Sequence, residues 1–275
     1  METGPIGVFD SGYGGLTILR SIREIMPGYD YVYLGDNARA PYGTKDFDTV
    51  FEYTLQAVRK LFGMGCPLVI LACNTASAKA LRNIQQHYIA DCCPERRVLG
   101  VIRPTAEIVG TITKTGHIGI LATPGTIKSE SYVLEIRKFF PDCHVTGLAC
   151  PSWVPLVESG MYDSTEADGE VRRQIDTLLM MDKDIDTIIL GCTHYPLLEK
   201  KIRQFCPPYV NIIAQGKYVA ESLRNYLERH TGMAGRISKG ATCRYFTTDS
   251  VDMVSKKMSV FLNKNIVVNS IKLEK

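Results

Sequence analysis

The chain has 275 residues, of which 45% are hydrophobic and 22% are charged, and this composition excludes the disordered and fibrous classes. The formal net charge of +3 arises from 32 basic and 29 acidic residues. No basic stretch is dense enough to predict nucleic-acid binding, so the expected ligand is a small molecule. The length suits either one large α/β domain or two lobes of ordinary size.

The amino-terminal segment METGPIGVFDSG has neither a basic start nor a long apolar core, so we expect no secretory signal. No apolar run approaches the roughly 18 residues of a membrane helix. We therefore expect a cytoplasmic protein that does not associate with membranes. Its nine cysteines form an odd set, which a reducing compartment would keep as thiols.

Short β-branched runs alternate with helical patterns along the chain, which is typical of parallel βαβ units. Two series of four strands are predicted, at residues 6–9, 31–34, 68–72 and 98–101, and then at residues 118–122, 145–149, 187–191 and 210–213. The second series repeats the order and approximate spacing of the first, and IGVFDSG pairs with IGILATPG as VILACNTA pairs with TIILGCTH. This similarity predicts a diverged tandem repeat.

A further unit follows the repeats, with a helix near 216–231, a strand near 243–248 and a helix near 250–262. It has no counterpart between the repeats, so we expect it to return to the first lobe. The predicted fold is α/β, with two pseudo-symmetric lobes, each a doubly wound parallel-sheet unit, and the active site in the cleft between them. Lobe A would comprise residues 1–100 plus 214–275, and lobe B residues 101–213.

Ligands of parallel α/β sheets bind beyond the carboxyl ends of the strands. The segments after the predicted strands include FDSGYGG, GDNARAPYG, CNTAS, TPG, CPSWVP and CTHYP. The glycines of DSGYGGL allow a sharp turn into a helix whose free amides could hold an anion. A helix cap at Ser11 is an equally simple explanation, because the segment fits neither GxGxxG nor GxxxxGK[ST].

Cys73 and Cys192 follow the third strand of each series, so related lobes would present them to the cleft from opposite sides. A thiolate and a thiol on the two faces of one carbon can remove a proton from one side and return one to the other, which inverts a stereocentre. A free thiol has a pKa of ~8.5, so such a base needs help from polar neighbours. Alternatively, either cysteine alone could be a small buried apolar residue.

Both cysteines have polar neighbours in the sequence, namely Asn74, Thr75 and Ser77 beside the first, and Thr193 and His194 beside the second. Asp10 ends the first strand, which should lie next to the third, within reach of Cys73. Glu158 and His194 could have the matching roles near Cys192. A hydrolase could instead use Cys192, His194 and Glu158, but Cys73 would then have no role. Neither cysteine belongs to a CxxC or HExxH pattern, so no metal site is predicted.

The segments FDSGYGGL, GDNARAPYG, ACNTASA, PLVESG and GCTHYP resemble, in order and spacing, the signature segments of the aspartate/glutamate racemase family. The cysteine segments are specific to that family, and the remaining segments favour its glutamate-specific members. The resemblance implies that Cys73 and Cys192 are the catalytic acid/bases, that Asp10 assists Cys73, and that Glu158 and His194 assist Cys192. It implies substrate contacts at Asp10, Ser11, Pro41, Tyr42, Gly43, Asn74, Thr75, Thr193 and His194.

The resemblance also implies racemisation of glutamate without a cofactor, to supply D-glutamate for peptidoglycan, in an enzyme that we expect to be a homodimer. No pyridoxal phosphate, metal or nucleotide is implied. The chain departs from the family after the fourth strand, where GVIRPTA, with Arg103 and Thr105, replaces a segment close to GVIEPG. The alternatives are another two-cysteine racemase, acting on aspartate or a hydantoin, and an amino-acid-binding protein that has no catalytic activity.

Overall fold

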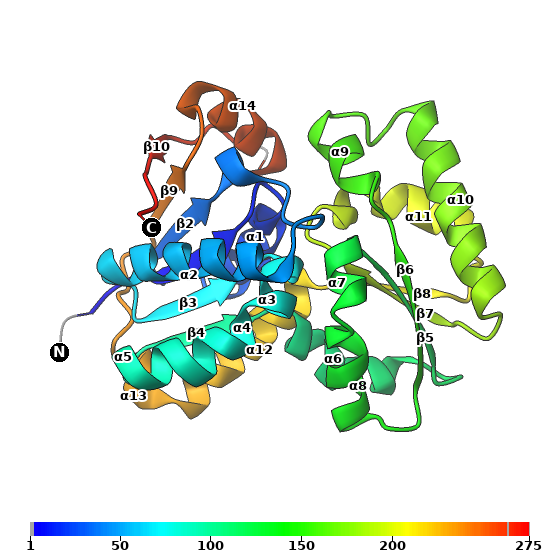
Figure 1. The fold of residues 1–275 in the computed structure, drawn as a ribbon, viewed down its shortest axis with the longest axis horizontal. Coiled ribbons are helices and arrows are strands. Elements are labelled where there is room, and N and C mark those ends of the chain that lie inside the picture. The colour runs from blue at the N-terminus through cyan, green and yellow to red at the C-terminus, as the bar shows by residue number, and fades with distance from the viewer. Residues whose placement is uncertain (1–2, 263, 275) are drawn as a thin grey trace. The chain divides into compact units, whose positions relative to one another are not determined.

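The computed structural model describes residues 3–262 and 264–274. The chain divides into two compact units, Met1–Val101 with Gly216–Lys275, and Ile102–Gln215. Each unit contains one sheet whose strands are all parallel, with helices between successive strands (Figure 1). The predicted α/β class is therefore confirmed.

The first unit is built on a six-stranded sheet in the order β10-β9-β2-β1-β3-β4. Its elements before the second unit are β1 (Ile6–Asp10), α1 (Gly15–Ile25), β2 (Tyr31–Gly35), the 3-10 turn η1 (Asn37–Arg39), α2 (Phe47–Gly63), β3 (Leu68–Leu71), α3 (Asn74–Lys79), α4 (Leu81–Asn83), the π-helical turn η2 (Ile84–Ile89), α5 (Ala90–Cys92) and β4 (Arg97–Gly100). The later elements are α12 (Gly216–Arg229), α13 (Thr231–Ala234), β9 (Cys243–Thr247), α14 (Val251–Leu262) and β10 (Val268–Ser270).

The carboxy-terminal segment extends the first sheet. Strand β9 pairs with β2, so the orange and blue strands that lie far apart in the sequence are neighbours in Figure 1. Helix α12 packs against α1. The sequence analysis did not predict β10, whose three residues are too few to show a periodic pattern.

The strands of the first unit are buried on both faces, as expected of a parallel sheet covered by helices. Alternate residues of β1 enter different cores, with Ile6 and Val8 in one and Phe9 in the other. The first core contains residues of α1, α12 and α14, and the second contains residues of α2 and α3. Because both sides of the sheet are covered, its polar residues concentrate at the strand ends.

The second unit has a four-stranded sheet in the order β6-β5-β7-β8. Its elements are α6 (Ile102–Ile112), β5 (His117–Ala122), α7 (Pro124–Lys128), α8 (Ser131–Phe139), β6 (His144–Ala149), α9 (Trp153–Glu158), α10 (Thr165–Met181), β7 (Thr187–Gly191), the 3-10 turn η3 (Tyr195–Leu198), α11 (Glu199–Phe205) and β8 (Asn211–Ala214). Helix α10 buries Val171, Ile175 and Leu178, at the i, i+4 and i+7 spacing of a single helix face.

The two sheets share the predicted repeat. Strands β2-β1-β3-β4 of the first unit have the same order as β6-β5-β7-β8 of the second. The backbone bonds correspond as well, because Arg97 N donates to Pro67 O at 3.1 Å and Asn211 N donates to Asp186 O at 2.7 Å, each just before the third strand of its unit. Cys73 and Cys192 therefore follow topologically equivalent strands.

Candidate active site

Cys73 lies at the carboxyl end of β3 and forms the N-cap of α3. Its sulfur accepts a hydrogen bond from the backbone N of Ala76 at 3.4 Å and lies 3.5 Å from the hydroxyl of Ser11. Only 6% of the residue is exposed to solvent. The amide and the hydroxyl are neutral donors that can stabilise a thiolate, which resembles the environment that activates cysteines elsewhere.

Asp10 ends β1, the strand adjacent to β3, as predicted. It is 1% exposed, and its Oδ2 accepts a hydrogen bond from Gly12 N at 2.9 Å. A Cβ atom at Gly15 would lie 2.5 Å from Asp10 Cβ and 3.1 Å from Ala72 Cβ. Asp10 and Ala72, the residue before Cys73, thus pack against the first turn of α1. Only a glycine at position 15 leaves room for this close packing.

Two further hydrogen bonds hold the segments around Cys73. Ser77 Oγ donates to Leu71 O at 2.9 Å, which ties the first turn of α3 to the end of β3. The hydroxyl of Tyr33 donates to Gly12 O at 3.0 Å and supports the turn that carries Ser11. Burial is the main cause of the raised pKa of Tyr33, and the nearby charges of Asp10 and Cys73 add to it.

The predicted substrate-binding segment after β2 is organised by Asp36. The carboxylate of Asp36 accepts hydrogen bonds from Tyr42 OH and, at 2.7 Å, from Arg39 Nε. Burial, followed by the Asp36 charge, raises the pKa of Tyr42 well above its ordinary value, so Tyr42 is a neutral donor. Tyr42 and Gly43 are buried, whereas Pro41 is exposed and follows a cis peptide bond.

Cys192 follows β7 and is 6% exposed, the same fraction as Cys73. Its sulfur lies 3.9 Å from Nδ1 of His194, and Nε2 of His194 lies 3.1 Å from a carboxylate oxygen of Glu158. The three side chains form a continuous chain from thiol to imidazole to carboxylate. The structure therefore brings together the three residues predicted for this half of the site.

His194 is buried, which opposes a positive charge on its ring. The hydrogen bonds and charges of Cys192 and Glu158 outweigh that opposition and raise the pKa of His194 to about 10. The imidazole is accordingly protonated at neutral pH and can donate to both partners.

Aromatic residues hold the Cys192 segment in place. Tyr195 packs edge-on against Trp153 with ring centroids 4.8 Å apart, and its hydroxyl donates to Cys150 O at 2.9 Å. Trp153 begins α9, and Glu158 ends the same helix. Helix α9 thus connects the aromatic contact with the carboxylate that reaches His194.

The remaining predicted residues are buried beside their cysteines, with Asn74 and Thr75 in the first turn of α3 and Thr193 directly after Cys192. The predicted set thereby forms two groups. Asp10, Ser11, Cys73, Asn74 and Thr75 meet in the first unit, where Tyr42 belongs to the same hydrophobic cluster as Cys73. Glu158, Cys192, Thr193 and His194 meet in the second.

The sequence analysis missed Tyr132 and Gln215 of the second unit. Gln215 Nε2 donates to Tyr132 OH at 2.6 Å. The ring of Tyr132 lies 3.1 Å from the position that a Cβ atom would have at Gly191, the residue before Cys192. Burial, followed by the nearby charge of Cys192, raises the pKa of Tyr132. Neither residue belongs to a recognisable motif. Only Gly191, which has no side chain and precedes Cys192, could have indicated that another residue packs closely there.

The departure at Arg103 and Thr105 lies in α6. Arg103 is exposed and pairs with Glu107 at 2.8 Å. Thr105 is buried and accepts a hydrogen bond from Gln215 Nε2 at 3.4 Å. Thr105 therefore belongs to the same network as Tyr132, whereas Arg103 stays on the surface.

Within the described residues, no helix combines the length and the apolar character needed to cross a membrane.

A family model described as Asp/Glu/Hydantoin racemase matches residues 6–244. A glutamate racemase from Ruegeria sp. is 38% identical over 273 residues, which cover 95% of this chain and 97% of that relative. The crystal structure of glutamate racemase isoform RacE1 from Bacillus anthracis has a TM-score of 0.90 at 32% identity and covers 99% of both chains. The Francisella tularensis glutamate racemase, solved with D-glutamate, has a TM-score of 0.88 at 30% identity and covers 100% of this chain and 99% of its own. With these matches across nearly its whole length, the chain belongs to the Asp/Glu/hydantoin racemase family.

Proposed function

We propose that the protein interconverts L-glutamate and D-glutamate without a cofactor, using Cys73 and Cys192 as two opposed acid/bases. The observation that carries the proposal is the equivalence of the two cysteines. Each follows the third strand of a sheet of the same order, each is 6% exposed, and each sulfur has a hydrogen-bonding partner. The names of the relatives support glutamate as the substrate.

In the proposed reaction one thiolate takes the α-proton and the opposite thiol gives a proton to the other face of the same carbon. The electron pair of the broken C–H bond stays on the α-carbon until the second proton arrives. Two-base racemisation therefore requires both sulfurs to reach one α-carbon. Hydrogen bonds to the α-carboxylate must stabilise the carbanion, because no electron sink is involved.

In this proposal, different groups stabilise the thiolate forms of the two cysteines. Ser11 and the amide of Ala76 stabilise the thiolate of Cys73. The cationic His194, held by Glu158, stabilises the thiolate of Cys192. Asp10 would assist Cys73, and its position at the end of the strand adjacent to β3 supports this role. In the reverse reaction the two cysteines exchange the roles of acid and base.

Substrate binding is proposed for the polar residues around the two cysteines, namely Asp10, Ser11, Pro41, Tyr42, Gly43, Asn74 and Thr75 in the first unit, and Thr193 and His194 in the second. The backbone N–H groups and hydroxyls among these residues suit the carboxylates of a zwitterionic amino acid, whereas the carboxylate of Asp10 suits its ammonium group. We further propose that the enzyme is a cytoplasmic homodimer and that its D-glutamate enters peptidoglycan synthesis. Sedimentation equilibrium of the full chain tests the dimer.

Incubation with L-glutamate in heavy water tests the function. Deuterium should be incorporated at the α-carbon while D-glutamate accumulates. With L-aspartate under the same conditions, both deuterium incorporation and racemisation should be much slower. A protein that binds glutamate yet exchanges no α-proton contradicts the proposal and indicates a binding protein. Faster conversion of aspartate would keep the two-cysteine chemistry but overturn the substrate.

A further inference from the structure

A second cluster of ionisable side chains lies at the amino-terminal edge of the second unit's sheet. His117 is the first residue of β5 and His144 is the first residue of β6. The two are direct register partners, and their ring centroids are 5.2 Å apart. Cys192 follows the carboxyl end of β7, which runs parallel to β5, so the histidines lie at the opposite edge of the same sheet.

Asp182 brings the histidines and the end of α10 together. Its side chain is only 8% exposed, and its carboxylate oxygens lie 2.9 and 3.1 Å from Nδ1 of His117. One of the same oxygens lies 3.8 Å from Nε2 of His144. Thr146 Oγ1 donates to it at 3.3 Å, which fixes the carboxylate from the side of β6.

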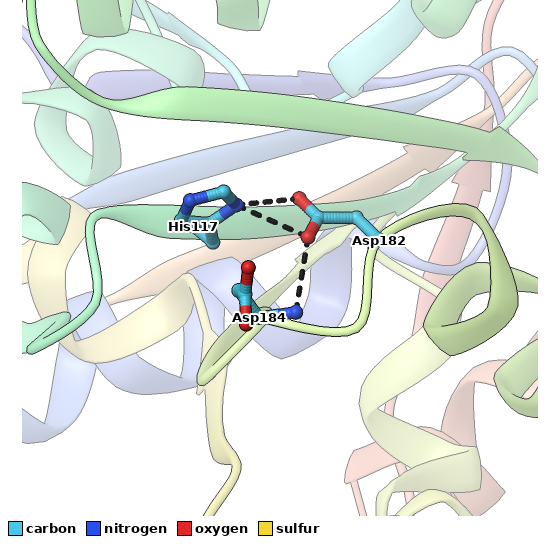
Figure 2. Close-up of side chains that lie close together, drawn as sticks. All are labelled: His117, Asp182 and Asp184. Carbon is cyan, nitrogen blue, oxygen red and sulfur yellow. Dashed lines mark hydrogen bonds and ion pairs between the residues drawn. The ribbon is translucent and has the colours of Figure 1, made fainter.

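Asp184 supplies a second carboxylate to the cluster. Its backbone N donates to Asp182 Oδ1 at 3.1 Å, so a tight turn places its side chain beside the His117 ring (Figure 2). One ligand atom each from His117, Asp182 and Asp184 lie within 4.8 Å of one another. Tetrahedral bonds of about 2.0–2.1 Å hold ligand atoms roughly 3.3 Å apart, so small side-chain rotations would close the cluster around an ion.

The chemistry of the cluster selects the kind of ion. Calcium and magnesium prefer oxygen ligands alone, whereas imidazole with carboxylate suits Zn²⁺ and its first-row neighbours. His144 is 64% exposed, which leaves an entry path and freedom to turn its ring. The adjacent Asp186 is already used by Thr113 Oγ1 and by the amides of Lys114 and Thr115, so it adds negative charge without acting as a ligand.

We propose that His117, His144, Asp182 and Asp184 form a binding site for one divalent transition-metal ion such as Zn²⁺. The bound ion connects the starts of β5 and β6 to the end of α10, and its effect is on the stability of the second unit. The sequence analysis predicted no metal because these ligands come from three separate segments and have no short characteristic spacing.

Titration of the full chain with Co²⁺ and Zn²⁺ under reducing, metal-free conditions tests the site. One Co²⁺ should bind with the visible absorption of nitrogen and oxygen ligation, and Zn²⁺ should displace it. His144→Gln should weaken binding by about tenfold or more, since even the loss of an outer-shell partner costs that much. The matched control is His87→Gln, which removes an exposed histidine of the first unit and should bind as the wild type does.

At the same Zn²⁺ concentration, the thermal midpoint of the wild type should also rise by more than that of His144→Gln. Two outcomes overturn the proposal. In one, neither ion binds, and the cluster is only an ion pair between His117 and Asp182. In the other, Co²⁺ gives thiolate charge-transfer absorption that His144→Gln leaves unchanged, which assigns binding to cysteines.

Discussion

The two cysteine environments occupy equivalent places in the two units but use different chemistry. Cys73 has a hydroxyl and a backbone amide, neither of which titrates near neutral pH. Cys192 has an imidazole whose other nitrogen bonds a carboxylate. The two cysteine residues are equally exposed, at 6%, so the difference does not come from solvent access. The two units therefore hold their cysteines at equivalent positions but surround them with different polar groups.

This difference makes the pH dependence of the two half-reactions unequal. Hydrogen bonds from neutral donors act on Cys73 at any pH that preserves the fold. In the proposed mechanism, Cys192 is assisted by the charge of His194, and Glu158 helps to raise the pKa of that imidazole. Variants that remove one partner at a time should therefore separate the two halves.

The largest effect is expected from the cysteines themselves. Cys73→Ser and Cys192→Ser should each slow racemisation by roughly 10²- to 10⁴-fold, the usual contribution of a positioned acid or base. Each variant retains one thiol, so in heavy water the two should exchange the α-proton of opposite enantiomers. Cys92→Ser, at an exposed position after η2, is the matched control and should be fully active. Racemisation at the wild-type rate by either active-site variant would falsify the two-base assignment.

An intermediate effect is expected from Glu158→Gln. Loss of this carboxylate lowers the raised pKa of His194, so the imidazole loses its proton at a lower pH. The alkaline limb of the rate profile should move to lower pH, and kcat should fall about 10- to 100-fold, as for the loss of a hydrogen bond to a charged group.

Rate profiles of both directions of the reaction, measured for each variant, check this expectation. Glu199→Gln provides the control, because that carboxylate pairs only with the exposed Arg203 among the contacts described. An unchanged alkaline limb in Glu158→Gln would mean that the charge of His194 does not support Cys192.

A smaller effect on the rate is expected from Ser11→Ala, which changes the surroundings of Cys73. The hydroxyl lies 3.5 Å from the Cys73 sulfur, and a neutral hydrogen bond of this kind contributes about 0.5–1.5 kcal/mol. The rate should fall roughly 2- to 10-fold with no change in the shape of the pH profile. A pH shift as large as that of Glu158→Gln would contradict the assignment of Ser11 as a neutral hydrogen-bonding partner of Cys73.

Much of the strand order and many of the strand positions could be predicted from the sequence, because parallel strands that are buried on both faces appear in the sequence as continuous apolar runs. The strand at 187–191 has the predicted bounds, and that at 98–101 is observed at Arg97–Gly100. Predicted loops such as TPG and CPSWVP contain the first turns of α7 and α9, since Pro124 and Trp153 already adopt helical geometry. Residue types alone do not fix the point at which a loop becomes a helix.

Site residues could be predicted where reactive side chains are close together in the sequence at the end of a strand. They could not be predicted where the contact joins segments that are far apart in the sequence. Cys192 and His194 are two residues apart, and both sit at a strand end. Tyr132 and Gln215 are 83 residues apart in the sequence, and their hydrogen bond joins the first turn of α8 to the residue that follows β8. Contacts of that kind follow from the tertiary fold, which one sequence does not specify by pattern.

The comparison extends to the other edge of the sheets, where the residue before the third strand is Pro67 in the first unit and Asp186 in the second. Asp186 accepts hydrogen bonds from Thr113, Lys114, Thr115 and Thr187, whereas proline has no side-chain acceptor. Asp186→Asn introduces an amide donor opposite these donors. It should lower the free energy of unfolding by about 1–3 kcal/mol, the usual cost of leaving buried polar groups unpaired.

The pH dependence of that loss identifies its cause. Burial raises the pKa of Asp186, but its four hydrogen bonds lower the pKa by more than burial raises it, so the pKa lies below the ordinary value for an aspartate. A carboxylate with a lowered pKa contributes stability above its unfolded pKa and loses it as the pH falls through the folded value. Denaturant unfolding should therefore show a constant difference in the free energy of unfolding between wild type and Asp186→Asn near neutral pH, and a smaller difference below about pH 4.

Racemisation by the folded variant should be unchanged, because Asp186 and Cys192 lie at opposite ends of β7. A difference that persists in acid would assign the loss to packing rather than to charge.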